Sequence, residues 1–283
     1  MANATIIDGK AVAAKVKNEI KNTVDLLAAD GKRIPCLTVI LVGDDPASAV
    51  YVRNKVKSCG ETGILSKQMI LPADTSEEEL LNKIYELNND DSIDGILVQL
   101  PLPKHIDAGK VTKAIDPAKD VDAFHPYNVG LARLGENTFE PCTPSGIIRL
   151  LDEYNVDISG RNCVVIGRSN IVGKPIADML MKRNGTVTVC HSKTPDITFF
   201  TKNADIIVVA VGKAGTLKGD MIKPGCTVID VGINRIDGKL YGDCDFDSSA
   251  EKAAYITPVP GGVGPMTIAM LLNNTITAYR MHK

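Results

Sequence analysis

The sequence predicts an α/β protein made of two α/β domains, the second a Rossmann-like parallel sheet, with a cleft between the domains. Short apolar runs alternate with segments of helical periodicity from one end of the chain to the other, which is typical of a parallel, doubly wound sheet. A glycine-containing turn at residues 167–175 lies between such a run and such a segment. The length, 283 residues, fits about two domains.

In the first half of the chain, helices and strands are expected to alternate. A helix should begin at Asp8 or Gly9, because apolar residues recur at helical spacing as far as Leu27. Asp44-Asp45-Pro46 has the pattern of an N-cap followed by proline in the first turn, which predicts a helix to about Gly60. Another helix should follow Ser76, because its acidic first turn suits the positive end of a helix. Apolar runs predict strands at residues 37–42, 66–71 and 95–98.

The second half begins after an interruption at residues 119–141, where Pro, Gly and short polar runs predict a linker. Thr143-Pro144 then predicts the start of a connecting helix. Strands are expected at residues 163–166, 186–190, 205–211 and 227–231, and helices at 171–183 and 266–281. We therefore divide the chain into a first domain at 1–140, a second at 141–264, and a C-terminal helix at 265–283 that returns to the first domain.

Composition and charge exclude several classes of protein. Lys and Arg number 32 and Asp and Glu number 34, so the net charge of −2 provides no basic field for a nucleic acid backbone. Aromatic residues are 4% and Trp is absent, which disfavours a stacking surface for single strands. No apolar stretch reaches membrane-spanning length, and the N-terminus has no pattern of a secretory signal. We expect a soluble, cytoplasmic protein without nucleic acid or membrane partners.

Neither a metal site nor a disulfide framework is expected. The seven cysteines are odd in number and form no CxxC pair, so they are interpreted as buried side chains in a reducing compartment. Asp243 and Asp245 lie near an Asp237-Gly238 pair that is typical of a hairpin turn, and we interpret them as turn residues.

The turn at residues 167–175 indicates a dinucleotide site. Gly167, Arg168, Ser169 and Gly173 follow a predicted strand and open a predicted helix, where free backbone N–H groups can meet a diphosphate. The match to GxGxxG is imperfect, and an ordinary tight turn is the alternative. The next strand ends Cys190-His191-Ser192-Lys193, without the acid typical of NAD sites. Arg168 and Ser192 can instead face a 2′-phosphate, which favours NADP; His191 is given no catalytic role.

Tyr51 and Lys55 form the candidate catalytic pair. They are four residues apart on the predicted helix and share one face, although a solvated helix face is the alternative. The YxxxK pattern is also found in short-chain dehydrogenases, but there the glycine-rich loop comes first, which is the reverse of the order here. Gln99 ends an apolar strand, at the edge where ligands of open α/β sheets bind. Asp122 lies in the predicted linker, where a cleft would open.

Six segments in order along nearly the whole chain resemble the bifunctional methylenetetrahydrofolate dehydrogenase/cyclohydrolase family. They are residues 49–55, 94–103, 120–126, 141–144, 167–175 and 260–267. Each segment is short, but together they are specific. Ala123 stands where a glycine would be expected after Asp122.

The resemblance implies two reactions of one-carbon metabolism that serve purine biosynthesis. NADP+ would take hydride from 5,10-methylenetetrahydrofolate, and water would convert 5,10-methenyltetrahydrofolate to 10-formyltetrahydrofolate. It also implies a catalytic, folate-binding first domain, an NADP-binding second domain and a homodimer built on the cofactor domain. The implied catalytic residues are Lys55, Tyr51 and Gln99; the substrate-binding residues are Tyr51, Asp122, Pro101, Pro260, Gly261 and Gly262; and the cofactor-binding residues are Gly167, Arg168, Ser169, Gly173, Ser192 and Ile233.

The implied division of labour places Lys55 at the proton transfers of hydrolysis, Gln99 beside it, and Asp122 on the N–H donors of the pterin. Two alternatives stay open at this point. One is a dehydrogenase with one of the two activities or another substrate, and the other is a non-enzymatic NADP-sensing or scaffold protein. An assay with methylenetetrahydrofolate and each nicotinamide cofactor separates them.

Overall fold

The structure, a computed structural model, describes residues 4–136 and 138–282. The chain forms two compact units. Unit 1 comprises the chain up to Ala13 together with Thr143–Thr267, and unit 2 comprises Ala14–Cys142 together with the chain from Ile268 onward. Three helices pass from one unit into the other: α1 (Gly9–Ala29), α6 (Cys142–Glu153) and α10 (Val263–Met281).

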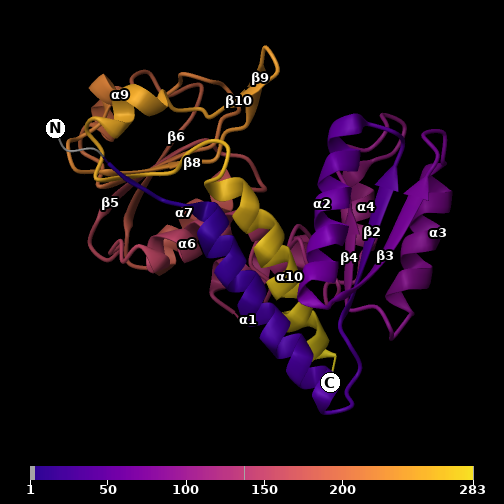
Figure 1. Cartoon of the computed structure of the whole chain (residues 1–283). Helices are drawn as coiled ribbons and strands as arrows, with labels where there is room; N and C mark the ends of the chain where they lie inside the picture. Colours follow the sequence, from indigo (N-terminus) through magenta and orange to yellow (C-terminus); the bar gives the residue numbers. More distant parts are fainter. Residues whose placement is uncertain (1–3, 137, 283) are drawn as a thin grey trace. The chain divides into compact units, whose positions relative to one another are not determined.

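Unit 2 is built on a three-stranded parallel sheet in the order β3-β2-β4. Its central strand is buried along its whole length, which explains the continuous apolar run in the sequence. Figure 1 shows α2 and α3 flanking this sheet, and leucine and isoleucine side chains of α3 join the core formed by β2 and β4. The elements of this unit are β2 (Cys36–Val42), α2 (Pro46–Thr62), β3 (Leu65–Leu71), α3 (Glu77–Asn88), β4 (Gly95–Val98), α4 (Ala108–Ala114) and α5 (Pro126–Leu134).

Unit 1 contains a six-stranded parallel sheet in the order β1-β11-β8-β7-β5-β6, with a separate antiparallel hairpin of β9 and β10. The interior strands β7 and β8 are fully buried. The remaining elements are β1 (Thr5–Ile6), β5 (Asn162–Ile166), α7 (Gly173–Lys182), β6 (Thr186–Cys190), α8 (Thr198–Thr201), β7 (Ile206–Val209), η1 (Gly219–Met221), β8 (Thr227–Asp230), β9 (Asn234–Ile236), β10 (Lys239–Tyr241), α9 (Phe246–Ala250) and β11 (Tyr255–Ile256).

The structure corrects the prediction of a linker at residues 119–141. This segment contains α5, and its first residues lie alongside β4, where Asp120 forms a parallel bridge with Ile96. The segment therefore belongs to unit 2. The predicted division also differs at the N-terminus, because β1 pairs with β11 and places residues before Ala14 in unit 1. At the other end of the chain, the compact units divide α10 after Thr267.

Among the described residues, no helix combines the length and apolar character needed to cross a membrane.

Candidate functional site

Helix α2 positions the candidate catalytic pair in unit 2. The Asp45 carboxylate accepts a hydrogen bond from the Ser48 N–H at 2.8 Å and caps the helix, as the sequence predicts. The helix ends at Gly63, which has a left-handed φ of 78°. In the register fixed by these ends, Lys55 is 8% exposed and Tyr51 is 45% exposed. Lys55 is thus held within the unit, whereas the Tyr51 ring is accessible.

Lys55 contacts the predicted residue at the end of β4. Its Nζ donates a hydrogen bond to Oε1 of Gln99 at 3.0 Å. The Gln99 backbone N–H continues the sheet by donating to the carbonyl of Ile40, and its Nε2 donates to the carbonyl of Leu100 at 2.6 Å. The amide of Gln99 is therefore oriented, with its carbonyl oxygen toward Lys55. A cis peptide joins Leu100 to Pro101, so this predicted substrate-binding proline directly follows the oriented glutamine.

Asp122 is positioned by the turn that follows the bridge to β4. Val121 is fully buried, and Gly95 leaves room for it, because a Cβ there would lie 2.8 Å from the Val121 side chain. The Asp120 carboxylate, also buried, accepts from the backbone N–H groups of Phe124 and His125 at 3.3 and 2.8 Å. Ala123 takes a positive φ of 60°, the conformation that the glycine expected here would adopt freely.

Asp122 and Lys55 lie close enough to interact electrostatically. Burial raises the pKa of the Asp122 carboxyl, and the positive charge of Lys55 and a thiol contact from Cys142 partly offset that rise. Burial also raises the pKa of neighbouring Asp120 to about 6, against the lowering effect of its hydrogen bonds. Unit 2 therefore holds Lys55 and Asp122 within electrostatic reach of each other, and the oriented amide of Gln99 is hydrogen-bonded to Lys55.

In unit 1, the predicted dinucleotide turn joins β5 to α7. Gly167 has a φ of 130°, and a Cβ there would lie 2.2 Å from the carbonyl oxygen of Ala210. A Cβ at Gly173 would lie 2.4 Å from the carbonyl oxygen of Gly167. The Ser169 hydroxyl accepts from the N–H groups of Val172 and Gly173, both at 3.2 Å. Both glycines are thus required by close backbone approach, as in a dinucleotide loop, and Ser169 shapes the turn.

The end of β6 carries no acidic side chain, and Arg168 and Ser192 are exposed. His191 is hydrogen-bonded locally, since its Nδ1 accepts from the Lys193 N–H at 3.2 Å. Ile233, a predicted cofactor-binding residue beyond β8, is 48% exposed.

The predicted substrate loop, Pro260–Gly262, packs against the start of α1 within unit 1. The carbonyl of Gly261 accepts from the Lys10 N–H at 3.1 Å, and the Gly262 N–H donates to Pro258 at 2.8 Å. A Cβ at Gly9 would lie 1.8 Å from the Gly262 carbonyl oxygen, so the approach requires glycine at position 9. A cis peptide precedes Pro260.

Two buried groups that contact the Asp122 region had no role in the sequence analysis. Cys142 lies within the segment 141–144, and Asn274 lies on α10, 152 positions after Asp122. The Asn274 amide donates to the carbonyls of Val121 and Glu140. A polar residue within the apolar face of the last helix was the available signal, but the sequence does not identify its partner.

Asp243 and Asp245, interpreted from the sequence as turn residues, accept hydrogen bonds from backbone N–H groups of a distant loop and of a helix start, respectively. Asp245 caps α9 through the Ser248 N–H at 3.1 Å. Asp243 is fully buried and accepts from three successive backbone N–H groups, those of residues 211–213, at 2.7–2.9 Å. It thereby shapes the loop at the carboxyl end of β7. Among residues 4–136 and 138–282, no group of His, Cys, Asp or Glu side chains is arranged to hold a metal ion.

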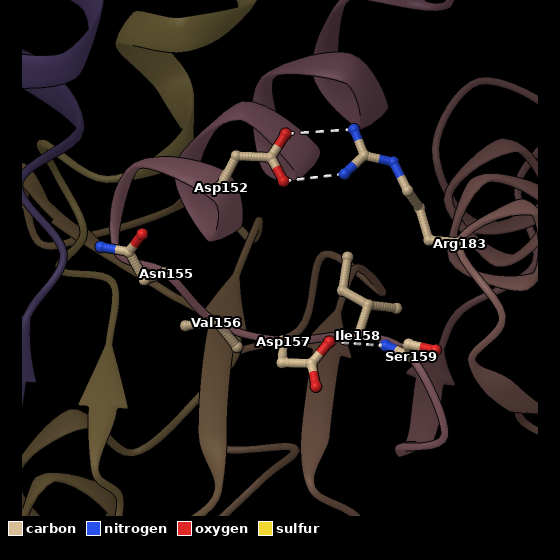
Figure 2. Close-up of a pocket in the computed structure, with 7 residues that line it drawn as sticks. All are labelled: Asp152, Asn155, Val156, Asp157, Ile158, Ser159 and Arg183. Carbon is tan, nitrogen blue, oxygen red and sulfur yellow. Dashed lines mark hydrogen bonds and ion pairs between the residues drawn. The ribbon is translucent and has the colours of Figure 1, made fainter.

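Figure 2 shows a pocket of about 440 Å³ in unit 1, at the C-terminal end of α7. Arg183 and Asp152 face each other across it in a bidentate ion pair, with N···O distances of 2.8 and 3.0 Å. The dinucleotide turn precedes the N-terminal end of α7, so the ten residues of this helix, about 15 Å, separate the turn from the pocket. The pocket is not part of the predicted site.

Two family models match most of the sequence. Residues 7–122 match the catalytic domain of tetrahydrofolate dehydrogenase/cyclohydrolase, and residues 141–283 match its NAD(P)-binding domain. A protein of Campylobacter hominis named bifunctional protein FolD is 59% identical over 272 residues, which cover 96% of this chain and 95% of that protein. The protein of the same name from Halalkalibacterium halodurans is 57% identical over 276 residues, with 98% and 99% covered.

Solved structures agree. The bifunctional FolD methylenetetrahydrofolate dehydrogenase/cyclohydrolase of Campylobacter jejuni superposes with a TM-score of 0.97 at 51% identity, covering 99% of this chain and 100% of that one. The Trypanosoma brucei enzyme, solved with NADP and an inhibitor, gives 0.95 at 41% identity, with 99% of each chain covered.

These matches confirm the predicted α/β class, the predicted pair of dehydrogenase and cyclohydrolase activities, and a nicotinamide dinucleotide as cofactor. A non-enzymatic sensor or scaffold is thereby set aside. With its two domain models in order and relatives above 50% identity over nearly the full length, the chain belongs to the tetrahydrofolate dehydrogenase/cyclohydrolase family.

Proposed function

We propose that the chain uses Lys55, Gln99, Tyr51 and Asp122 to oxidise 5,10-methylenetetrahydrofolate and to hydrolyse the resulting 5,10-methenyltetrahydrofolate to 10-formyltetrahydrofolate. The observation that carries this proposal is the buried Lys55, whose Nζ contacts Gln99 and which interacts electrostatically with Asp122. A lysine on a solvated helix face, the alternative at the sequence level, would be exposed and without such partners.

In the oxidation, the protein mainly positions the substrate. The carbon that loses hydride lies between two nitrogens, whose lone pairs stabilise the cation that forms, so alignment dominates over acid–base chemistry. When bound, NADP+ supplies the acceptor for the hydride. Asp122 holds the adjacent N–H donors of the pterin, a geometry that suits a carboxylate. The accessible Tyr51 ring orients the substrate, with Pro101 and the loop Pro260–Gly262 as further substrate contacts.

In the hydrolysis, water attacks the cationic carbon and a proton must leave that water. Lys55, as the neutral amine, is the group proposed to accept this proton, because its Nζ lies beside the oriented Gln99 amide in unit 2. Gln99 fixes the position of Nζ through its Oε1. The same unit thus contains both the group that binds the pterin and the group that serves the attacking water.

The cofactor residues are proposed to be Gly167, Arg168, Ser169, Gly173, Ser192 and Ile233. A dinucleotide diphosphate suits the turn of unit 1, because Gly167 and Gly173 permit the tight turn from β5 into α7, and the N-terminus of a helix favours negative charge. Arg168 and Ser192 are exposed at the edge where β5 and β6 end, and the absence of an acid there favours the 2′-phosphate of NADP over the 2′-hydroxyl of NAD.

The division of the chain, its assembly and its location belong to the same proposal. The catalytic and folate-binding part is assigned to unit 2, which holds most of the first 140 residues and most of the C-terminal helix, and the NADP-binding part to unit 1, which holds most of residues 141–264. A homodimer built on the cofactor unit is supported by β6, an edge strand that pairs with β5 in the described sheet. Sedimentation would then give twice the chain mass of 30.3 kDa. We place the enzyme in the cytoplasm, in one-carbon supply to purine biosynthesis.

The experiment that tests the residue roles compares Asp122→Ala and Asp122→Asn with the control Asp91→Ala, which changes an exposed aspartate of the same unit. Both Asp122 variants should reduce kcat/KM of the dehydrogenase and of the cyclohydrolase together, by about 100-fold, because the pterin loses a charged acceptor in both reactions. The control should match the wild type. Wild-type folate affinity and turnover in a folded Asp122→Asn variant would contradict the assignment.

A further inference from the structure

Asn274 is a buried polar side chain in the apolar interior of unit 2. It lies on α10 and is 5% exposed. Its Nδ2 donates hydrogen bonds to two backbone carbonyls that are 19 positions apart in the sequence, those of Val121 and Glu140, each at 2.9 Å. Since an amide nitrogen carries two hydrogens, each carbonyl can receive one of them. Asn274 therefore connects two segments of the chain, through the carbonyl of the residue before Asp122 and through a carbonyl two residues before α6.

A second contact connects Asn274 to the Asp122 carboxylate itself. Its Nδ2 lies 3.7 Å from Sγ of Cys142, at a distance suited to a weak donor contact with sulfur. The thiol in turn points to the carbonyl of Val121 at 3.4 Å and to Oδ1 of Asp122 at 3.8 Å. Burial raises the pKa of the Cys142 thiol well above its usual value, so the sulfur keeps the proton that it donates. Asn274 is thus linked to Asp122 by two routes: it binds the carbonyl of the preceding residue, Val121, and it contacts the Cys142 thiol, which contacts Asp122.

The backbone around Asp122 needs such a restraint. Ala123, directly after it, is held at a φ of 60°, which L residues other than glycine disfavour. On the far side of Val121, the Asp120 carboxylate holds the turn through the N–H groups of residues 124 and 125. Nothing equivalent from that side fixes the Val121 carbonyl, which accepts from Asn274 and from the Cys142 thiol.

A neutral side chain with two N–H donors is the group that this position requires. Aspartate has the same shape, but its oxygens would face the carbonyls of Val121 and Glu140 as acceptors against acceptors. Alanine would leave the Glu140 carbonyl without the amide donor and the Val121 carbonyl with the thiol alone. Each change would release the chain that carries Asp122 without altering any group that would touch substrate.

We propose that Asn274 is a positioning residue for the folate site, which fixes Asp122 through the Val121 carbonyl and the Cys142 thiol. The inference rests on the proposed role of Asp122 in holding the pterin. It assigns a function to the last helix that the residue roles above do not include.

The experiment compares Asn274→Asp with Asn273→Asp, the matched change at the neighbouring exposed position of the same helix. Asn274→Asp should raise the KM for methylenetetrahydrofolate about tenfold and lower the two activities in parallel, because Asp122 serves both. The KM for NADP+ should remain within about twofold of wild type, since the contacts lie in unit 2. Asn273→Asp should leave every constant at the wild-type value. If Asn274→Asp does not fold, Asn274→Ser, which keeps one donor, gives the same comparison with a smaller expected rise.

A double-mutant cycle separates positioning from general destabilisation. With Asp122→Asn already present, the Asn274 change should add little further loss of kcat/KM, because its effect runs through the same carboxylate. Fully additive losses, an equal rise in the KM for NADP+, or a wild-type KM for folate in the Asn274 variants would overturn the inference. Full activity in the single variant Asp122→Asn would instead overturn the proposed function on which the inference rests, so the two failures are distinguishable.

Discussion

Replacing Lys55 by methionine should separate the two activities. Methionine has a similar length and is apolar, so it can occupy the 8% exposed position while removing the ammonium and its 3.0 Å hydrogen bond to Gln99. A positioned proton-transfer group contributes about 10²–10⁴ in rate, so the cyclohydrolase kcat should fall by that factor. The dehydrogenase depends chiefly on alignment and should lose about tenfold, the cost of one polar contact.

The same substitution should also move a pH profile. The charge of Lys55 holds the pKa of Asp122 below the value that burial alone would give, so its removal raises that pKa. Since the carboxylate form would hold the pterin, the acidic limb of the dehydrogenase profile should shift to higher pH in Lys55→Met. A variant that lost proton transfer alone, with no effect on Asp122, would show no such shift.

Both rates are measured on the same purified protein. The dehydrogenase assay starts from methylenetetrahydrofolate, and the cyclohydrolase assay starts from methenyltetrahydrofolate. Folding is checked by thermal melting. The control is Lys57→Met, because the Lys57 side chain is 77% exposed two positions along the same helix. Lys55→Met leaves Oε1 of Gln99 without its donor, which should lower the free energy of unfolding by about 1 kcal/mol and Tm by about 2–4 °C. Cyclohydrolase activity near wild type would remove Lys55 from the mechanism, and equal collapse of both rates with intact substrate binding would refute the division of labour.

Three further predictions concern the cofactor turn and stability. Arg168→Ala should raise the KM for NADP+ more than that for NAD+, and steady-state kinetics with both cofactors that gave equal rises would show that Arg168 does not contact the 2′-phosphate. Gly167→Ala should lower Tm and raise the KM for NADP+, because its Cβ would meet the Ala210 carbonyl at 2.2 Å; Gly160→Ala, with a positive φ but open space, should cost only about 1–2 kcal/mol and leave that KM unchanged. Asp120, with a folded pKa of about 6 against 3.8, retains its proton longer in the folded state, so the free energy of unfolding should fall by about 3 kcal/mol as pH rises from 4 past 6; denaturant titrations of Asp120→Asn should lack that part of the decline.

Regular elements were predictable because their signals are local. The Asp45 cap with Pro46, the Ser76 cap with its acidic first turn and the buried run of β2 each act within a few residues, and the structure contains all three. The hairpin at Asp237-Gly238 is likewise fixed by two residues that accept positive φ values of 49° and 77°. Local pattern also placed Lys55 on a helix and Gln99 at the end of a strand, whereas their proximity was implied by the family resemblance.

The segment at residues 119–141 shows where local pattern fails. Its Pro, Gly and Asn residues are typical of a linker, yet Asp120 lies beside β4 and α5 follows. What fixes this segment is a set of long-range contacts, such as the room that Gly95 leaves for Val121, and no property of the segment itself encodes them. The same reason explains the short strand β1, whose two residues become a strand because β11, about 250 positions later, provides an edge.

In the candidate site, too, long-range contacts are not evident from local sequence. Lys55 and Asp122 could be assigned roles because the segments around them resemble a known family; residue type and helical spacing alone left a solvated helix face as the alternative for Lys55. Asn274 could not, because one amide in a mostly apolar helix is compatible with many partners. Its significance comes from the 2.9 Å contacts to the carbonyls before Asp122 and before α6, which exist only after the chain has folded. The residues proposed to touch substrate are therefore accessible from the sequence in this protein, whereas the proposed positioning residue becomes evident from the packing of α10.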